Sequence, residues 1–308
     1  MAASRKKMIF RAILLVFGVF CGSTAVIMIK ASNEHPFLVS AYRLLLASFF
    51  LSPFFFRELR SSGIRYGWRE LGWAALPAAA LAIHFMSWVY GARMTPAANA
   101  SLIANLTPVA MPFYLWMLYR ERVSKMELFG TAFTLAGLLI LTGSNLRVSQ
   151  ENFIGDLICF GSMLFFAAYL ALGRKNGARL SLWLYMVPLY FIAGLICLVS
   201  ACFFINPIKV YSLSNVLYIL GLGLIPTVLG HTILNYAMKH FRGQVVSVTN
   251  LSQPVFAGLL GFLIFHEVPS PVFLVAAVVV ISGVLIVLNE GWIKNWRERR
   301  SRLGQAGE

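Results

Sequence analysis

The chain has 308 residues, of which 59% are hydrophobic and only 12% are charged, and its formal net charge is +15. Soluble domains carry roughly 25% charged residues, so this composition excludes an ordinary water-soluble protein and predicts a chain embedded in lipid. The positive charge does not indicate a nucleic-acid partner, because the positions of the basic residues have a membrane explanation.

Ten apolar segments follow one another along the chain, and a helix needs about 20 such residues to cross a bilayer. They cover residues 9–30, 36–56, 70–92, 96–119, 126–145, 153–173, 181–205, 213–238, 243–265 and 271–290. The first segment follows a basic stretch, as in a signal peptide, but its apolar run is too long for one. No small-residue cleavage site follows it either, so we expect a retained first helix.

The basic residues lie mainly on one side of the predicted bundle. With the N-terminus in the cytoplasm, most of the 26 Lys and Arg residues fall in cytoplasmic loops and ends. This pattern predicts an even number of spans with both chain ends in the cytoplasm, including a basic tail at 291–308. The net charge is then a topology signal, with some attraction to anionic lipids. We expect a multi-pass protein of a bacterial cytoplasmic (inner) membrane.

The four cysteines all fall inside apolar segments and show no CxxC spacing; they are Cys21, Cys159, Cys197 and Cys202. This pattern favours buried small hydrophobic residues over a disulfide framework or a metal site. Nothing in the sequence indicates a cofactor.

The second segment contains Arg43, a basic residue well inside a predicted span. An unpaired charge at that depth is expensive. Arg43 is therefore a candidate contact for a carboxylate or phosphate on a substrate. The alternative is a structural role, in which Arg43 caps backbone carbonyls or extends to the outer face, and the sequence favours that role.

The third and eighth segments carry matching polar pairs at helical spacing. His84 and Trp88 are four residues apart, and so are His231 and Asn235. Polar side chains inside spans need partners and usually face the bundle interior or a wet cavity. Cavity lining is favoured because both copies carry the pattern, and packing between helices is the alternative.

The fourth and ninth segments each carry a stripe of polar residues and prolines at three- or four-residue spacing. The stripes are Ser101, Asn105, Pro108 and Pro112 in the fourth and Ser247, Asn250 and Pro254 in the ninth. A proline bends a helix and frees a backbone carbonyl. We expect Pro108 and Pro254 to kink their helices around a cavity, with a static kink that only shapes the bundle as the alternative.

The second half of the chain repeats the first. Pro108, Glu121 and Gly137 recur 146 positions later as Pro254, Glu267 and Gly283. With an odd number of segments per repeat, the second copy must be inserted upside down, which predicts Glu121 on the cytoplasmic face and Glu267 on the outer face. Both are expected to be structural helix ends. No acidic residue is predicted at mid-membrane, so transport is uncoupled, or His84 or His231 takes a proton, or coupling is indirect.

These repeats resemble the EamA-domain members of the drug/metabolite transporter superfamily, over 97–143 and 243–287 and around Arg43. The resemblance implies ten transmembrane helices in a 5+5 inverted repeat, with five helices in 9–145 and five in 153–290. It also implies a cavity lined mainly by the third, fourth, eighth and ninth helices, with help from the first and sixth. Among the members of this family, the chain resembles the YddG-like amino-acid exporters. The substrate-binding residues implied are His84, Trp88, Ser101, Asn105, His231, Asn235, Ser247 and Asn250.

The function expected is a secondary transporter or facilitator that moves small polar metabolites by alternating access. A nearly uncharged cavity favours zwitterionic or neutral solutes such as amino acids. One alternative is a larger adenosyl- or nucleotide-type compound stacked on Trp88. An intramembrane enzyme is disfavoured because the sequence has no HExxH motif and no carboxylate near its deep histidines. The expected partners are a small-molecule substrate and the lipid bilayer, without nucleic acid, and the oligomeric state stays open.

Overall fold

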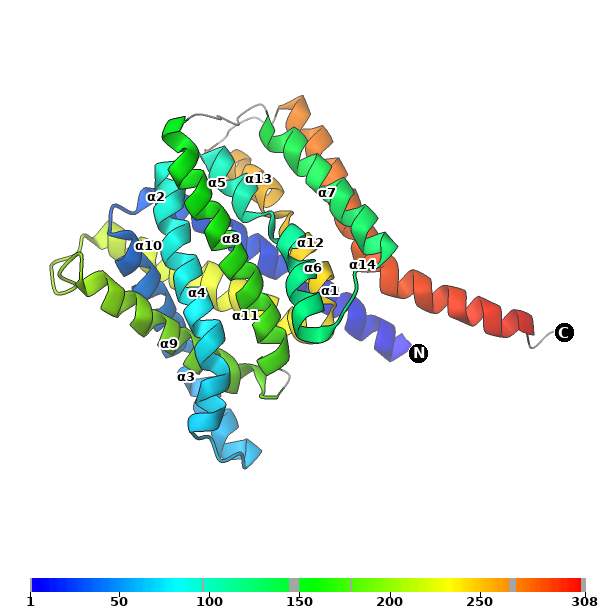
Figure 1. Cartoon of the computed structure of the whole chain (residues 1–308), viewed down its shortest axis with the longest axis horizontal. Helices are drawn as coiled ribbons and strands as arrows, with labels where there is room; N and C mark the ends of the chain where they lie inside the picture. Colours follow the sequence, from blue (N-terminus) through cyan, green and yellow to red (C-terminus); the bar gives the residue numbers. More distant parts are fainter. Residues whose placement is uncertain (1, 96, 144–149, 178, 266–269, 306–308) are drawn as a thin grey trace.

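The computed structural model describes residues 2–95, 97–143, 150–177, 179–265 and 270–305, and these residues form helices joined by loops, with no strand (Figure 1). The helices, in chain order, are α1 (Ala2–Ser23), α2 (Ala25–Ala31), α3 (Pro36–Ser62), α4 (Trp68–Met94), α5 (Ala97–Ala104), α6 (Thr107–Tyr119), α7 (Lys125–Gly143), α8 (Gln150–Gly177), α9 (Leu182–Cys202), α10 (Leu213–Leu222), the π-helix η1 (Gly223–His231), α11 (Thr232–His240), α12 (Gly243–Asn250), α13 (Gln253–Phe265) and α14 (Pro271–Gln305).

Eight stretches of the described chain are helical, long and apolar enough to cross a membrane. They are Lys6–Ala31, Pro36–Ser62, Trp68–Met94, Leu102–Tyr119, Asn152–Gly177, Leu182–Cys202, Leu213–His240 and Pro271–Asn289. They coincide with eight of the ten predicted segments, including the first, and the chain is an all-α membrane protein as its composition predicts. The other two predicted segments correspond to α7 and to α12 with α13, and ten spans stay a prediction.

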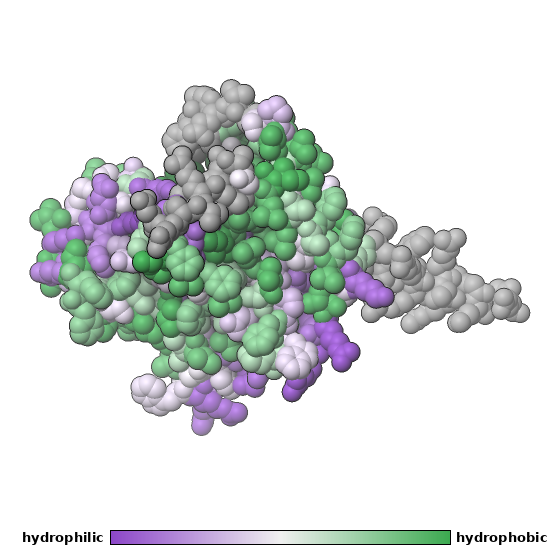
Figure 2. All heavy atoms as spheres, turned by 45° about the horizontal axis from the view of Figure 1, so that its top comes forward, coloured by the Kyte–Doolittle hydropathy of each residue, from purple (hydrophilic) through white to green (hydrophobic). Residues whose placement is uncertain are grey.

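The surface of the bundle is apolar over broad areas. Phe49, Leu128 and Val278 are each 65–70% exposed, and Figure 2 shows hydrophobic residues across the middle of one face with polar ones toward its margins. Soluble monomers rarely expose apolar surface on this scale, whereas lipid tails cover it without cost. The described cysteines are free thiols, and three are buried. The prediction of burial is wrong for Cys202, because it ends α9 just where the chain leaves the bundle.

Two helices are interrupted at equivalent places in the two repeats. α5 ends at Ala104 and α6 begins at Thr107, while α12 ends at Asn250 and α13 begins at Gln253. The backbone N–H groups of Asn105 and Leu251 bond the carbonyls three residues earlier, at 3.2 and 3.0 Å, so each break is a tightened turn.

Pro108 and Pro254, which were expected to kink their helices, lie at these breaks. Each proline is the second residue of a new helix, a position where its missing N–H costs no intrahelical bond. The carbonyls freed by the fourth segment's prolines bind neighbours: Thr107 donates to Ala104 O at 3.2 Å. Pro112 cannot donate to Pro108 O, and Gln244 of α12 does so instead, at 3.2 Å.

The repeated glycines Gly137 and Gly283 lie where α7 and α14 pack side by side (Figure 1). A Cβ at Gly137 would lie 2.8 Å from the backbone nitrogen of Val280, and one at Gly283 would lie 2.8 Å from that of Thr134. Any side chain at these positions would force the backbones apart. Equivalent glycines thus allow the two helices to touch at equivalent points.

Candidate functional site

A small cavity of about 60 Å³ lies inside the bundle, where segments of the two repeats meet. Its walls come from both halves of the chain, and the lining residues are Gly22, Ala25, Arg43, His84, Phe85, Trp88, Ala104, Asn105, Phe166, Pro226, Gly230, His231, Leu234, Asn250 and Gln253. Pockets that enclose drug-sized ligands typically measure 300–1,000 Å³. This cavity is therefore too small for a ligand of that size.

The two equivalent histidines face each other in this cavity. The ring centroids of His84 and His231 are 6.4 Å apart. Nδ1 of His84 lies 2.9 Å from the hydroxyl oxygen of Ser162 on α8, which fixes the ring. The ring of Phe166 stacks on His84 at 4.7 Å between centroids. The two histidines come from different halves of the chain, so the pair joins the halves inside the cavity.

Arg43 enters the cavity from α3 and is only 1% exposed. Its Nε donates to the hydroxyl of Thr227 on η1 at 3.0 Å, and its guanidinium carbon lies 4.1 Å from the ring centroid of Phe85. Nη1 and Nη2 have no hydrogen-bond partner. The guanidinium neither caps a backbone carbonyl nor extends to the surface, so both structural alternatives considered for Arg43 are wrong in their details.

The π-helix η1 sets the position of Thr227. The Thr227 hydroxyl donates to the carbonyl of Leu222, five residues earlier, at 2.7 Å. Pro226 cannot donate a backbone hydrogen bond, which favours such an irregular turn. The wider turn turns Thr227 toward α3 and Gly230 toward α1, where a Cβ would lie 3.2 Å from the backbone nitrogen of Gly22.

The helix breaks supply the amides of the cavity. Asn105 and Asn250 both line it and are both buried. Nε2 of Gln253 donates to Oδ1 of Asn250 at 2.7 Å. Gln253 is the residue inserted in the second copy of the Asn-Leu-Thr/Ser-Pro stretch, so a strict comparison of the repeats passes over it. Phe85 and Phe166 also escaped prediction, since aromatic residues are common throughout the spans.

The structure brings five of the eight predicted binding residues to the cavity: His84, Trp88, Asn105, His231 and Asn250. Asn235 lies behind it, donating to Tyr169 and, at 2.9 Å, to the carbonyl of His231. Ser247 is fully buried elsewhere and donates to Gln244 O at 3.0 Å. The side chain of Ser101 lies outside the described part of the structure.

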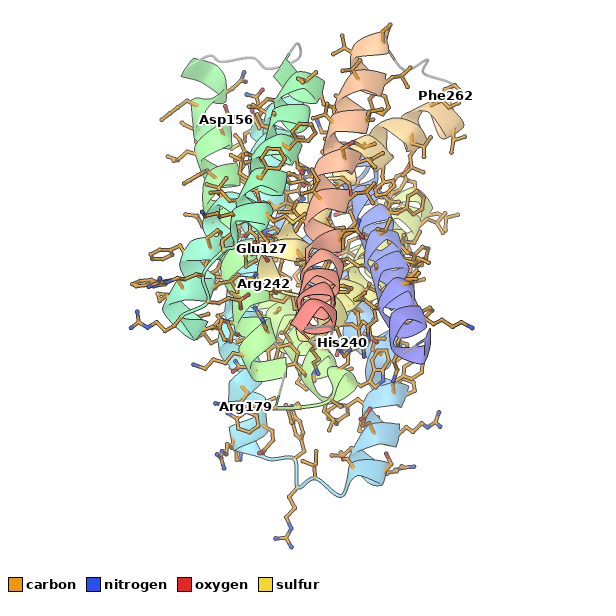
Figure 3. The ribbon with its side chains drawn as sticks, turned by 90° about the vertical axis from the view of Figure 1, so that its right-hand side faces the viewer. Glu127, Asp156, Arg179, His240, Arg242 and Phe262 are labelled. Carbon is orange, nitrogen blue, oxygen red and sulfur yellow. The ribbon has the colours of Figure 1, made fainter. Side chains whose placement is uncertain are left out.

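Ion pairs join the two halves of the chain near one end of the bundle. Glu121, at the end of α6, pairs with Arg174 of α8 and, at 3.0 Å, with Arg242 before α12. Arg242 also pairs with Glu127 of α7 at 3.1 Å, and Figure 3 shows these two residues side by side. Glu121 thus has the structural role expected of it, whereas Glu267 lies outside the described residues.

A second set of polar contacts joins the halves near the other end. Glu34, between α2 and α3, pairs with Lys209 at 2.6 Å and accepts from Nδ2 of Asn215 at 3.2 Å. Asp156 of α8 accepts from Thr95 at 2.6 Å. Figure 3 places Asp156 toward one end of the bundle and Arg179 and His240 toward the opposite end. Two sets of contacts thus cross from one repeat to the other, toward opposite ends of the bundle.

Within the described residues, no three or more His, Cys, Asp or Glu side chains group closely enough to hold a metal ion. The chemistry that the cavity offers is recognition: one guanidinium, two imidazoles, amides and aromatic rings. Fold and site together define a helical membrane protein with a polar cavity between two repeats.

Comparison with known proteins places this class of protein in a family. The EamA-like transporter family matches residues 9–143 and 153–289, and the chain belongs to that family. Two matched units separated by a short linker agree with the repeat in the sequence. The protein is accordingly a membrane transporter of the drug/metabolite type, as the resemblance implied.

Several relatives carry transporter names. An uncharacterized transporter of Archaeoglobus fulgidus is 25% identical over 87% of this chain and 93% of its own length. The uncharacterized transporter YyaM of Bacillus subtilis is 28% identical over 63% of this chain and 65% of its own. Human solute carrier family 35 member G1 is 24% identical over 60% of this chain and 53% of its own.

A solved crystal structure shares the fold. It superposes with a TM-score of 0.75 and 18% identity, covering 90% of this chain and 95% of the other. At that identity the likeness concerns the fold alone.

Proposed function

We propose that the protein is a secondary transporter or facilitator that moves small polar metabolites, amino acids or similar solutes, by alternating access. The observation that carries this proposal is the cavity between the repeats, where His84 meets His231 and where Asn105 and Asn250 come from equivalent breaks. Cavities at repeat interfaces near the middle of the bilayer are the usual substrate sites of such transporters.

The proposed architecture is ten spans in a 5+5 inverted repeat with both chain ends in the cytoplasm of a bacterial cell. The reciprocal packing of Gly137 and Gly283 and the paired helix breaks support equivalence of the repeats. The ion pairs around Glu121 and around Glu34 lie near opposite ends of the bundle and cross between repeats. In alternating access, one set separates while the other persists.

A second candidate substrate class follows from the aromatic lining. Trp88, Phe85 and Phe166 surround the cavity, and stacking on them suits a solute with a heteroaromatic ring, such as an adenosyl compound. Such a solute needs a much wider cavity than a small amino acid does.

Counterflow in proteoliposomes tests the function. Vesicles loaded with an unlabelled panel of amino acids, neutral polar solutes and adenosyl compounds are expected to accumulate the matching labelled solute only when they contain the protein. Repeating the assay with an imposed pH gradient reports proton coupling. Lack of exchange for every solute in the panel would reject the proposal.

Substitution of the cavity amides connects exchange to the site. Asn105→Leu and Asn250→Leu should each lower exchange at least tenfold, since a leucine leaves polar cavity and substrate groups without a partner, at about 1–3 kcal/mol per group. Asn289→Leu is the matched control, because Asn289 is exposed on α14 and bonds only its own helix, at 2.8 Å. Normal exchange in both cavity variants would reject the assignment of the cavity.

A further inference from the structure

Among the described residues that line the cavity, Arg43 is the one permanently charged side chain, and no carboxylate accompanies it there. The other titratable groups of the lining, His84 and His231, are bases and offer no counter-charge. None of the ion pairs of the described residues includes Arg43. The cavity therefore carries a positive charge that the described chain does not neutralise.

The guanidinium is held in one orientation. Thr227 binds its Nε edge at 3.0 Å, and Phe85 lies against its flat face at 4.1 Å. Since the Nε–H is used, the two terminal nitrogens form the remaining edge, and both lack a hydrogen-bond partner. Two parallel N–H donors on one edge match the two oxygens of a carboxylate.

An unpaired buried cation is costly, and burial inside a membrane protein makes it costlier. Charges of this kind persist in membrane proteins mainly where they pair with each other or contact a transported solute. Because no described residue of the cavity lining supplies the negative charge, that charge is left for the substrate.

We propose that Arg43 is the anion subsite of the transporter, and that its substrates are small solutes that carry one carboxylate. This inference rests on the proposed transport function and narrows it. One guanidinium balances one carboxylate, whereas a phosphate monoester carries close to two negative charges at neutral pH. Zwitterionic amino acids satisfy the requirement. Neutral solutes, which the sequence pattern admitted, do not.

The remaining lining suits the rest of such a solute. The Asn105 and Asn250 amides offer donors and acceptors on the other side of the cavity, and Trp88 offers a ring face for an ammonium or an apolar side chain. Arg43 would thus fix one end of the solute while these groups select among its other parts.

The test compares solutes that differ only at the carboxylate. Counterflow in proteoliposomes uses each exchanged amino acid beside its primary amide and its methyl ester. Wild-type protein is expected to exchange the acid at least tenfold faster than either derivative at low concentration. Equal exchange of acid and amide would overturn the assignment while leaving the transport function intact, whereas no exchange of any solute overturns the function itself.

Three variants locate the effect. Arg43→Gln should abolish exchange of acids, and Arg43→Lys, which keeps the charge but loses the paired donors, should raise the apparent KM for acids at least tenfold. Thr227→Val should raise that KM severalfold with little change in maximal rate, because the charge stays but its orientation is lost. The controls are Arg57→Gln, at an exposed arginine, and Thr249→Val, at a buried threonine that bonds only its own helix.

Folding is followed by the thermal unfolding temperature in detergent. A stabilising shift with an amino acid, absent with its amide and absent in Arg43→Lys, supports the subsite without any flux measurement. If Arg43→Gln does not fold, the acid and amide comparison and Arg43→Lys still decide the question. Unchanged KM values for acids in Arg43→Lys would overturn it.

Discussion

The polar residues inside the spans were found from sequence because each interrupts an apolar run and needs a partner in lipid. The same argument selected His84, His231, Asn105 and Asn250, and all four line one cavity. The spacing rule does not say whether a polar side chain points into the cavity or toward a neighbouring helix. Two residues four positions apart lie on the same helix face but can have different partners. Asn235 therefore satisfies the same spacing rule but turns to Tyr169 behind the cavity wall.

The state of Arg43 shows a second limit of sequence at this scale. Sequence places a charge in a span but cannot say which atoms surround it. Its two fixed contacts come from Thr227, far along the chain, and from Phe85. Hydroxyl groups and aromatic rings occur many times in the spans, and only the fold determines which of them contact Arg43.

His35 supplies a pH-dependent contact outside the spans. It precedes α3, and its Nδ1 accepts from the backbone N–H of Phe37 at 3.3 Å. Partial burial lowers the pKa of His35 below its ordinary value of 6.5, and the nearby charges of Arg93 and Lys209 lower the pKa further. The folded state therefore favours the neutral ring, which is the form that can accept the hydrogen bond.

The contribution of His35 to stability is complete above the unfolded pKa of about 6.5 and is lost as the pH falls from there through the folded pKa. Relative to His35→Asn, which caps without titrating, the wild type should lose stability between pH 7.5 and 5, by no more than the roughly 1 kcal/mol of a helix cap. The assignment would be contradicted if the melting temperatures of the wild type and of His35→Asn changed equally with pH across this range.

At the scale of helices, eight of the ten segments predicted from sequence coincide with helices long enough to span a membrane, but the interruptions of the helices were not predicted. A proline within an apolar run is compatible with a bend or with a restart of the helix. Whether the helix bends or restarts depends on which groups bind the carbonyls that the prolines free. Here the side chains of Thr107 and Gln244 bind them. Gln244 lies on α12, so the decision is made by tertiary packing and cannot be derived from the local sequence.

The α7 and α14 contact predicts paired effects of alanine. Gly137→Ala and Gly283→Ala should each lower stability by about 1–3 kcal/mol, because the added methyl group meets the backbone of the other helix. Gly72→Ala and Gly161→Ala are matched controls within helices, where nothing lies within 4 Å of the added carbon. The controls should be neutral or slightly stabilising, since alanine favours helix more than glycine does.

Reversible denaturation in detergent micelles measures these differences. If Gly137→Ala and Gly161→Ala unfold at the same denaturant concentration, the close approach of the α7 and α14 backbones does not contribute to stability. Similar losses at Gly137 and Gly283 are also expected from the equivalence of the repeats, because each alanine meets the same kind of backbone atom.

For the whole molecule, sequence predicted orientation from charge and repetition, and the structure adds the contacts that cross between the halves. The ion pairs of Glu121 and of Glu34 each join residues from both repeats, near opposite ends of the bundle. The positions of the charged residues in the sequence do not predict these ion pairs, because the partners are more than 50 residues apart. Under the proposed alternating access, opening of the cavity toward one side would break the contacts on that side.

Inverted insertion makes a direct prediction about two loop positions that are equivalent in the repeats. Ile64 lies between α3 and α4, and Val210 lies 146 positions later between α9 and α10. Both are exposed, Ile64 at 39% and Val210 at 98%. If the repeats were inserted in the same direction, equivalent positions would face the same compartment. Insertion with opposite directions places Ile64 in the cytoplasm and Val210 outside.

Labelling of single cysteines separates these arrangements. In a chain whose four native cysteines are replaced, Val210→Cys should react with a membrane-impermeant maleimide added to intact cells, and Ile64→Cys should react only in inverted vesicles or after permeabilisation. Arg179→Cys, at the same end of the bundle as His240 in Figure 3, should behave like Ile64→Cys. Labelling of Ile64→Cys and Val210→Cys from the same side would show parallel repeats, and the cavity could not then be an alternating-access site between inverted halves.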